Sequence, residues 1–399
     1  MHNDTMHGDE GRYMQFAENL CHGFYSSPPP DINLWNGPAY PIFLMPFVLL
    51  KLPLICITLT NAVLQYLSIV FLFKTLLNYV KRNVALFFSF FWACYYIAYP
   101  EIPLILTECF TSFLIVLFLY FLSLSFKKID KNNFHLYAGF IFGILVLAKI
   151  IFGYVLLLML VLASLSYFIW RSEKTKKASL IFLVAFLLNI PYLLYTYSLT
   201  NKIFYWGNSG GMSLYWMSTP HEGEFGDWNN PTFTANCGHA ADVPCNADLL
   251  AKNHQKNMAY VHQFVGVERD NLYKKLAFEN IKKHPKKYIE NCISNLGRLF
   301  FGVPTSYFYQ RNATLKRFPP NAILLTFLFF CIIPTLLNFK NNIPIELKMV
   351  LGIAFSYLFL SMLVSAYPRQ LTVIVPILLF WFAFVMEKCV SFQILIEND

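Results

Sequence analysis

Long apolar runs are the feature that most limits what this chain can fold into. A helix needs about 20 mostly apolar residues to cross a bilayer. Nine segments can be interpreted in this way, although several are short or contain proline: 53–73, 84–99, 103–126, 134–148, 150–170, 178–199, 322–337, 345–365 and 371–386. A further apolar run, 41–50, is too short to span and precedes the first of them.

Composition supports the membrane interpretation. The chain is 57% hydrophobic and only 13% charged, whereas soluble domains carry roughly 25% charged residues. Because a bilayer offers the backbone no hydrogen-bond partner, long apolar runs are stable there only as helices or closed barrels. The composition excludes a disordered chain and an ordinary cytosolic enzyme. It favours an all-α polytopic membrane protein with a helical bundle.

The apolar runs divide the chain into five parts. We expect an outer first segment (1–52), six spanning helices (53–199), a large outer loop (200–321), three spanning helices (322–388) and a cytoplasmic tail (389–399).

Lys and Arg in the short loops predict the orientation, since short cytoplasmic loops carry the excess of positive charge. One set of loops carries Lys74, Lys81, Arg82, Lys127, Lys128, Lys131, Arg171, Lys174, Lys176, Lys177, Lys340, Lys348 and Lys388, and the opposite set carries only Arg12, Lys149 and Arg369. Residues 1–40 and 200–321 then face outward. The net charge of +9 therefore reflects topology, and a nucleic-acid partner is not expected.

The outward placement of residues 1–40 raises a question of delivery. No apolar helix precedes them, and no signal-peptide pattern is visible before His22. We expect that a first helix upstream of Met1 is missing from this chain. The alternative is that the short N-terminus is translocated unaided.

The first outer segment begins with two adjacent acids, Asp9 and Glu10. Apolar residues then follow at helical spacing on one face: Tyr13, Phe16, Ala17, Leu20 and Phe24. This pattern predicts an amphipathic helix lying in the membrane interface. The acids would lie at its N-terminal end, where the helix dipole favours carboxylates. They can also be interpreted as no more than an N-cap and a first-turn acid.

Several outward motifs together resemble the GT-C membrane glycosyltransferases, in the branch of ArnT, protein mannosyltransferase and RgtA/B/C/D-like enzymes. They are GDE-x-RY-x(3)-A-x-NL-x(2)-G-x-Y followed by a Pro-rich stretch and GPAYPIFL, then LTECF, then G-x(3)-G-x-L-x(2)-AK, then YKKLAFENIKKHPKKYIENCISNLGRLFF, and finally SAYPRQLTVIVPILLF. The chain departs from the family in lacking the first helix and in having Gln370 where Tyr is common.

The resemblance implies an activity. Such enzymes move a sugar from a polyprenyl-phosphate donor to an envelope lipid, glycan or protein at the outer face of the cytoplasmic (inner) membrane, with inversion. It implies that Asp9 is the general base, and that Glu10 orients the acceptor or substitutes for Asp9. A divalent metal is not expected.

Cations and one further acid lie at the outer ends of apolar segments. Lys149 and Arg369 are the expected ligands of the donor phosphate, because an unpaired cation is costly there; snorkelling to the interface is the alternative. Glu108 is expected to pair with Lys149 or to hold the acceptor, and otherwise is a helix-start acid.

The large loop contains further candidates. His221 could approach the donor phosphate, but His221, Glu222, Glu224 and Asp227 match no zinc spacing. A basic stretch on a helix could contact anionic headgroups or simply be solvated: Lys274, Lys275, Lys282, Lys283, Lys286 and Lys287. Cys237 and Cys245 could form a disulfide in an oxidising periplasm, or stay as free or metal-binding thiols with His239.

Two other functions compete with sugar transfer. A transporter or flippase for a lipid-linked glycan would place charges near the midplane on broken helices, whereas here they gather at one face. A truncated, inactive family member with a binding role is the other alternative.

Overall fold

The structure is a computed structural model. It describes residues 6, 8–126, 132–231, 246–309, 312–339 and 342–389. Its elements, in chain order, are α1 (Asp9–Cys21), α2 (Ala39–Leu49), α3 (Leu54–Leu76), α4 (Arg82–Cys94), the 3₁₀ helix η1 (Tyr96–Glu101), α5 (Glu108–Ser125), α6 (Phe134–Ala148), α7 (Ile151–Trp170), α8 (Glu173–Thr200), α9 (Gly210–Met217), α10 (Ala247–Val261), α11 (Gly266–Lys283), α12 (Pro285–Phe301), α13 (Asn312–Asn338), α14 (Ile345–Leu363) and α15 (Pro368–Lys388). These ranges contain no β-strand.

Within those ranges, seven helices are long and apolar enough to cross a membrane: α3, α5, α7, α8, α13, α14 and α15. The expected all-α polytopic membrane protein is therefore confirmed. The other two expected spans form shorter apolar helices, α4 and α6, of 13 and 15 residues. The chain after α4 tightens into η1, which contains Pro100, so the segment 84–99 does not continue as one helix.

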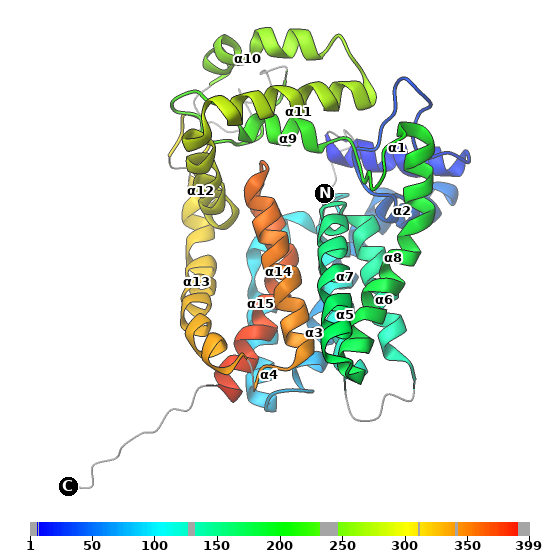
Figure 1. The fold of residues 1–399 in the computed structure, drawn as a ribbon, viewed down its shortest axis with the longest axis vertical. Coiled ribbons are helices and arrows are strands. Elements are labelled where there is room, and N and C mark those ends of the chain that lie inside the picture. The colour runs from blue at the N-terminus through cyan, green and yellow to red at the C-terminus, as the bar shows by residue number, and fades with distance from the viewer. Residues whose placement is uncertain are drawn as a thin grey trace, which may run out of the picture.

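The spanning helices lie side by side along the long axis of the molecule, and α1, α9, α10 and α11 lie across one end (Figure 1). Helix α15 is the most enclosed, since every residue from 371 to 385 is buried. It packs against α5, which is also largely buried. The first residues of α5 and α15 are therefore held at the end that α1 and the large loop cover.

Helix α1 forms where the sequence predicts it, but its apolar face packs against its own chain. Tyr13 and Phe16 are buried. The Tyr13 ring meets Tyr40 with centroids 5.1 Å apart, and the Phe16 ring meets Tyr25 at 4.6 Å. The membrane-facing interpretation of this face is therefore wrong, because the segment after α1 folds back and covers it. Phe24 lies beyond the helix and is exposed.

The large loop folds into helices with a hydrophobic cluster of its own. The cluster joins α9, α10 and α11 through Met212, Tyr215, Trp216, Leu250, Met258, Val261, Tyr273 and Ala277. Helix α12 then descends toward α13, and the two form a column at one side of the bundle (Figure 1). The loop is thus a folded cap above the spanning helices.

Candidate functional site

A cavity of about 670 Å³ lies beneath this cap. Four of the residues expected at the site line it: Asp9, Glu108, Lys149 and Arg369. They come from four separate parts of the chain: Asp9 and Glu108 are the first residues of α1 and α5, Arg369 is the second residue of α15, and Lys149 lies in the short connection between α6 and α7. Helices α1, α5, α7, α9 and α15 all begin at the cavity wall. Helix N-termini carry partial positive charge and unpaired N–H groups, so this arrangement favours an anion.

Five charged residues of the wall form a continuous chain of ion pairs. Asp9 Oδ1 lies 2.8 Å from an Arg12 guanidinium nitrogen, and Asp9 Oδ2 lies 2.7 Å from one of Arg369. Arg369 Nε lies 3.8 Å from Glu108 Oε1, which is 3.2 Å from Lys149 Nζ. The alternation of cation and anion allows these groups to share a wall that is partly shielded from solvent.

Both oxygens of Asp9 are therefore occupied by guanidinium groups. Burial alone would raise the pKa of this carboxyl, but Arg369 and Arg12 together hold it below its usual value. Asp9 is therefore held in its ionised form, and it binds a proton weakly while both arginines contact it.

Arg12 is a site residue that sequence reasoning missed. Its guanidinium carbon lies 4.8 Å from the centre of the Trp35 ring, and it donates a long hydrogen bond of 3.4 Å to Asn36 Oδ1. These contacts hold the Arg12 side chain in place, and Arg12 in turn holds the Asp9 carboxylate. The spacing of Arg12 three residues after Asp9 on a helix was the available signal.

Glu108 is the most buried acid of the wall, only 4% exposed. Lys149 Nζ donates to its Oε1, which is the expected pairing. Its Oε2 has no hydrogen-bond partner among the described residues. This oxygen is the one acceptor of the ion-pair chain that is left available inside the fold.

Glu101 is a third acid of the wall, and sequence reasoning missed it as a site residue. It lines the cavity from η1, together with Lys316 and Arg317 of the first turns of α13. Burial, and then the negative charge of Glu108, raise the pKa of Glu101 to about 7. Its charge therefore changes in the neutral range.

The turn that carries Lys149 is held by a close backbone approach. Gly37 packs against the carbonyl group of Leu147, and a Cβ at position 37 would overlap that backbone. The N-G-P sequence before α2 thus places Trp35 and Asn36 beside the end of α6.

Glu10 does not line the cavity. Its Oε1 accepts a hydrogen bond of 2.9 Å from the backbone N–H of Ile105. The acid adjacent to Asp9 therefore joins α1 to the segment before α5.

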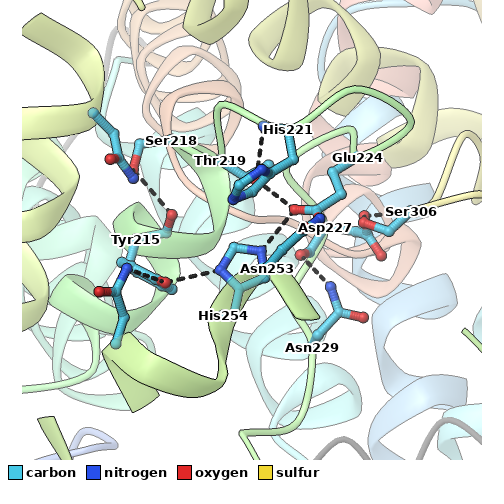
Figure 2. A network of polar contacts seen from close by, with 12 residues as sticks. Tyr215, Ser218, Thr219, His221, Glu224, Asp227, Asn229, Asn253, His254 and Ser306 are labelled. Carbon is cyan, nitrogen blue, oxygen red and sulfur yellow. Dashed lines mark hydrogen bonds and ion pairs between the residues drawn. The ribbon is translucent and has the colours of Figure 1, made fainter. Parts of the chain in front are cut away.

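His221 also lies away from the cavity, in a polar cluster of the cap (Figure 2). There His254 Nε2 lies 2.8 Å from Glu224 Oε2 and His254 Nδ1 lies 2.8 Å from the Tyr215 hydroxyl. The His221 ring is 5.2 Å from that of His254. Burial alone would raise the pKa of Glu224, but hydrogen bonds from its neighbours, first that of His254, hold it at about 2. Among the described residues, no three His, Cys, Asp or Glu side chains are grouped as metal ligands would be.

The cap segment 225–228 is tied to the wall of the cavity. Ser306 donates two hydrogen bonds, of 2.7 and 2.6 Å, to Asp227 Oδ1. Ser365 Oγ donates to the carbonyl of Gly226 at 2.8 Å, and the Tyr367 hydroxyl donates to the carbonyl of Trp228 at 3.4 Å. Trp228 lines the cavity, so the cap and the turn before Arg369 are positioned together.

The basic stretch of the cap is only partly engaged. Lys274 pairs with Asp270 at 2.5 Å, and Lys287 donates to the carbonyl of Glu224 at 2.8 Å. Lys282, Lys283 and Lys286 are exposed. Cys237 and Cys245 lie outside the described residues, and the seven cysteines within them are unpaired.

Comparisons with known proteins add little to this geometry. No protein-family model matches the chain, and no curated protein matches it. A solved structure to which it is similar is ArnT from Cupriavidus metallidurans bound to undecaprenyl phosphate, with a TM-score of 0.37 and 12% identity over 96% of this chain and 72% of that one. At that similarity the likeness assigns no role to any residue here.

Proposed function

We propose that this chain is an inverting glycosyltransferase of GT-C type. It would transfer a sugar from a polyprenyl-phosphate donor to an envelope acceptor, at the outer face of the cytoplasmic membrane. One observation carries the proposal: an ionised carboxylate and a guanidinium, Asp9 and Arg369, lie 2.7 Å apart on the wall of one cavity. Transfer from a phosphate needs a base for the acceptor and a cation for the leaving group.

The charge of the wall suits a phosphate. Five cationic side chains line the cavity against three acids: Arg12, Lys149, Lys316, Arg317 and Arg369 against Asp9, Glu101 and Glu108. The helix N-termini at the same wall add partial positive charge. A phosphate group entering here would exchange its hydration for charge-assisted hydrogen bonds, above all with the planar fork of Arg369.

In the proposed step, an acceptor hydroxyl oxygen attacks the anomeric carbon from the side opposite the phosphate. A carbon–oxygen bond forms to the acceptor as the bond from the anomeric carbon to the phosphate oxygen breaks. The electron pair of the broken bond stays on that oxygen, and polyprenyl phosphate leaves. The hydroxyl proton passes to Asp9 and then to water, so the configuration at the anomeric carbon inverts.

Other wall residues support that step. Arg369 and Lys149 would stabilise the charge that develops on the leaving phosphate. Glu108 would hold Lys149 in place through Oε1 and offer Oε2 to a hydroxyl of the sugar or the acceptor. Glu10 has a structural role in this proposal, because it accepts from Ile105, and His221 has none in phosphate binding.

A transporter of a lipid-linked glycan is the competing function. It would require charged groups along a path through the bundle. The ion pairs described above lie instead at the ends of α1, α5 and α15, which supports chemistry at one face.

The proposal is tested by comparing envelope glycolipids and glycans by mass spectrometry, in cells with and without the protein. We expect one class of molecule to lose the mass of a sugar. Wild type and the Glu18→Gln variant should restore it, because Glu18 is an exposed acid of α1, and Asp9→Asn should not. Full restoration by Asp9→Asn would remove Asp9 from the role of base. An unchanged glycan profile without the protein would contradict the proposed function.

A further inference from the structure

Asp9 is not free to act as a base in the structure described here. Its Oδ1 is held by Arg12 at 2.8 Å and its Oδ2 by Arg369 at 2.7 Å. Hydrogen bonds between ionised partners are about twice as strong as neutral ones. A carboxylate gripped through both oxygens by two cations is stabilised in its ionised form and has little tendency to take a proton.

The two arginines form a cradle of the kind that binds a phosphate. Arg12 rests on the Trp35 ring and reaches Asn36, and Arg369 extends from the first turn of the enclosed helix α15. Both guanidinium groups line the cavity. The Asp9 carboxylate lies in this cradle, so the chain supplies its own anion to the two groups that would bind an anionic ligand.

A second anion cannot enter the cradle without disturbing the first. A phosphate on Arg369 would lie close to the Asp9 carboxylate, and like charges a few ångströms apart repel strongly in a partly dry cavity. The phosphate therefore competes with Asp9 for the guanidinium. Once Arg369 turns to the phosphate, Asp9 keeps only Arg12 and its affinity for a proton rises.

We propose that Asp9 is a placeholder anion in an Arg12–Arg369 cradle, and that the phosphate of a polyprenyl phosphate displaces it from Arg369. The base is then released only when the lipid phosphate is bound. Arg12 is a positioning residue that retains the released carboxylate at the cavity. This coupling rests on the proposed function, and it orders the reaction, since the donor must bind before the acceptor can lose its proton.

Competition of this kind predicts a gain of affinity when the placeholder is removed. Polyprenyl phosphate binding to the purified full chain in nanodiscs is measured at pH 8, where Glu101, whose pKa is about 7, is mostly ionised. We expect Asp9→Asn to bind it about tenfold more tightly than wild type, because the phosphate no longer has to break a charge-assisted hydrogen bond. A role of Asp9 limited to structure predicts equal or weaker binding.

Two control variants and one control ligand separate displacement from general electrostatics. Glu101→Gln removes a negative charge from the same cavity, but no ion pair from Glu101 to Arg12 or Arg369 occurs among the described residues. It should improve affinity by no more than about twofold. Glu18→Gln removes a charge from the exposed part of α1 and should change nothing. Polyprenol, which lacks the phosphate, should bind wild type and Asp9→Asn equally.

Asp9→Ala provides a second variant if Asp9→Asn does not fold, because it removes the same charge and leaves no amide to contact the arginines. Tighter phosphate binding by either folded variant, exceeding that of Glu101→Gln, supports the placeholder. Equal binding by wild type and both Asp9 variants overturns it and leaves the proposed function standing. No binding of polyprenyl phosphate to any of these proteins contradicts the proposed function itself.

Discussion

Arg369 contacts two acids at once, and this makes it the centre of the cavity wall. Its guanidinium lies 2.7 Å from Asp9 and 3.8 Å from Glu108. A planar fork can keep one acid while it turns toward a phosphate, whereas a lysine ammonium offers a single point of charge. The residue also follows Pro368 at the start of α15, so its backbone is fixed by the enclosed helix.

We predict that Arg369→Gln lowers kcat/KM for sugar transfer by about 10²–10³, because it removes a cation that stabilises the leaving phosphate. Arg369→Lys should retain more activity than Arg369→Gln but remain well below wild type. Initial rates with the donor identified by the glycan comparison provide the measurement. Arg171→Gln, at the opposite end of α7, is the matched control. Equal rates for Arg369→Lys and wild type would show that the fork is not needed.

Glu101 should give phosphate binding at the cavity a pH dependence in the neutral range. With its pKa raised to about 7, the side chain is mostly neutral at pH 6 and mostly charged at pH 8. The cavity is then more positive at pH 6 than at pH 8. Polyprenyl phosphate should therefore bind more tightly at pH 6, once the titration of the phosphate group itself is corrected for. We expect Glu101→Gln to bind at pH 8 as wild type binds at pH 6 or below, with a flatter profile. An identical profile for variant and wild type would contradict this assignment.

At the scale of elements, the cap and the bundle meet through the segment 225–228. Hydrogen bonds from Ser306, Ser365 and Tyr367 hold it against the turn before α15. The Glu224 and His254 pair, with Tyr215, anchors the adjacent loop to α9 and α10 (Figure 2). Cap stability should therefore influence the shape of the cavity.

We predict that Glu224→Gln destabilises the cap at pH 7 by up to about 3 kcal/mol, the equivalent of a pKa near 2 against an ordinary value near 4.5. Because the pKa is lowered in the folded state, this stabilisation is present above pH 4.5 and is lost as the pH falls toward 2. Thermal unfolding in detergent at pH 7 and pH 3 tests it. The variant should differ from wild type at pH 7, and by less than half as much at pH 3. Glu222→Gln, an exposed acid in the same loop, should match wild type at both.

The elements also show which features the sequence could predict. Apolar runs locate the spanning helices because the period and length of hydrophobicity are local properties. The packing partner of the apolar face of α1 is not a local property, because it depends on Tyr25 and Tyr40 folding back over that face. In the same way, the sequence predicts four site residues from their positions at the ends of helices: Asp9, Glu108, Lys149 and Arg369. It does not predict their ion pairs or the role of Arg12, because these depend on packing between distant segments.

Across the described residues, the cavity and the cap occupy one end, and the connection between α7 and α8, which carries Arg171 and Lys174, lies at the other (Figure 1). This asymmetry is what the charge pattern predicts for a protein whose cavity faces outward. In a background without native cysteines, we predict that a membrane-impermeant maleimide labels a cysteine placed at Glu18 in intact cells. It should label one placed at Glu173, the exposed first residue of α8, only after permeabilisation. The reverse pattern would place the cavity in the cytoplasm.

The most direct test of the account is the release of polyprenyl phosphate by the purified chain. Proteoliposomes containing wild type, Asp9→Asn or Glu18→Gln are supplied with polyprenyl-phosphate-linked sugars and acceptors extracted from the host membrane, and the lipids are followed by mass spectrometry. Wild type and Glu18→Gln should convert polyprenyl phosphate sugar to polyprenyl phosphate while one acceptor gains the same sugar mass. Asp9→Asn should bind the donor and convert almost none of it. Conversion by Asp9→Asn at the wild-type rate, or no conversion by wild type, would contradict the account.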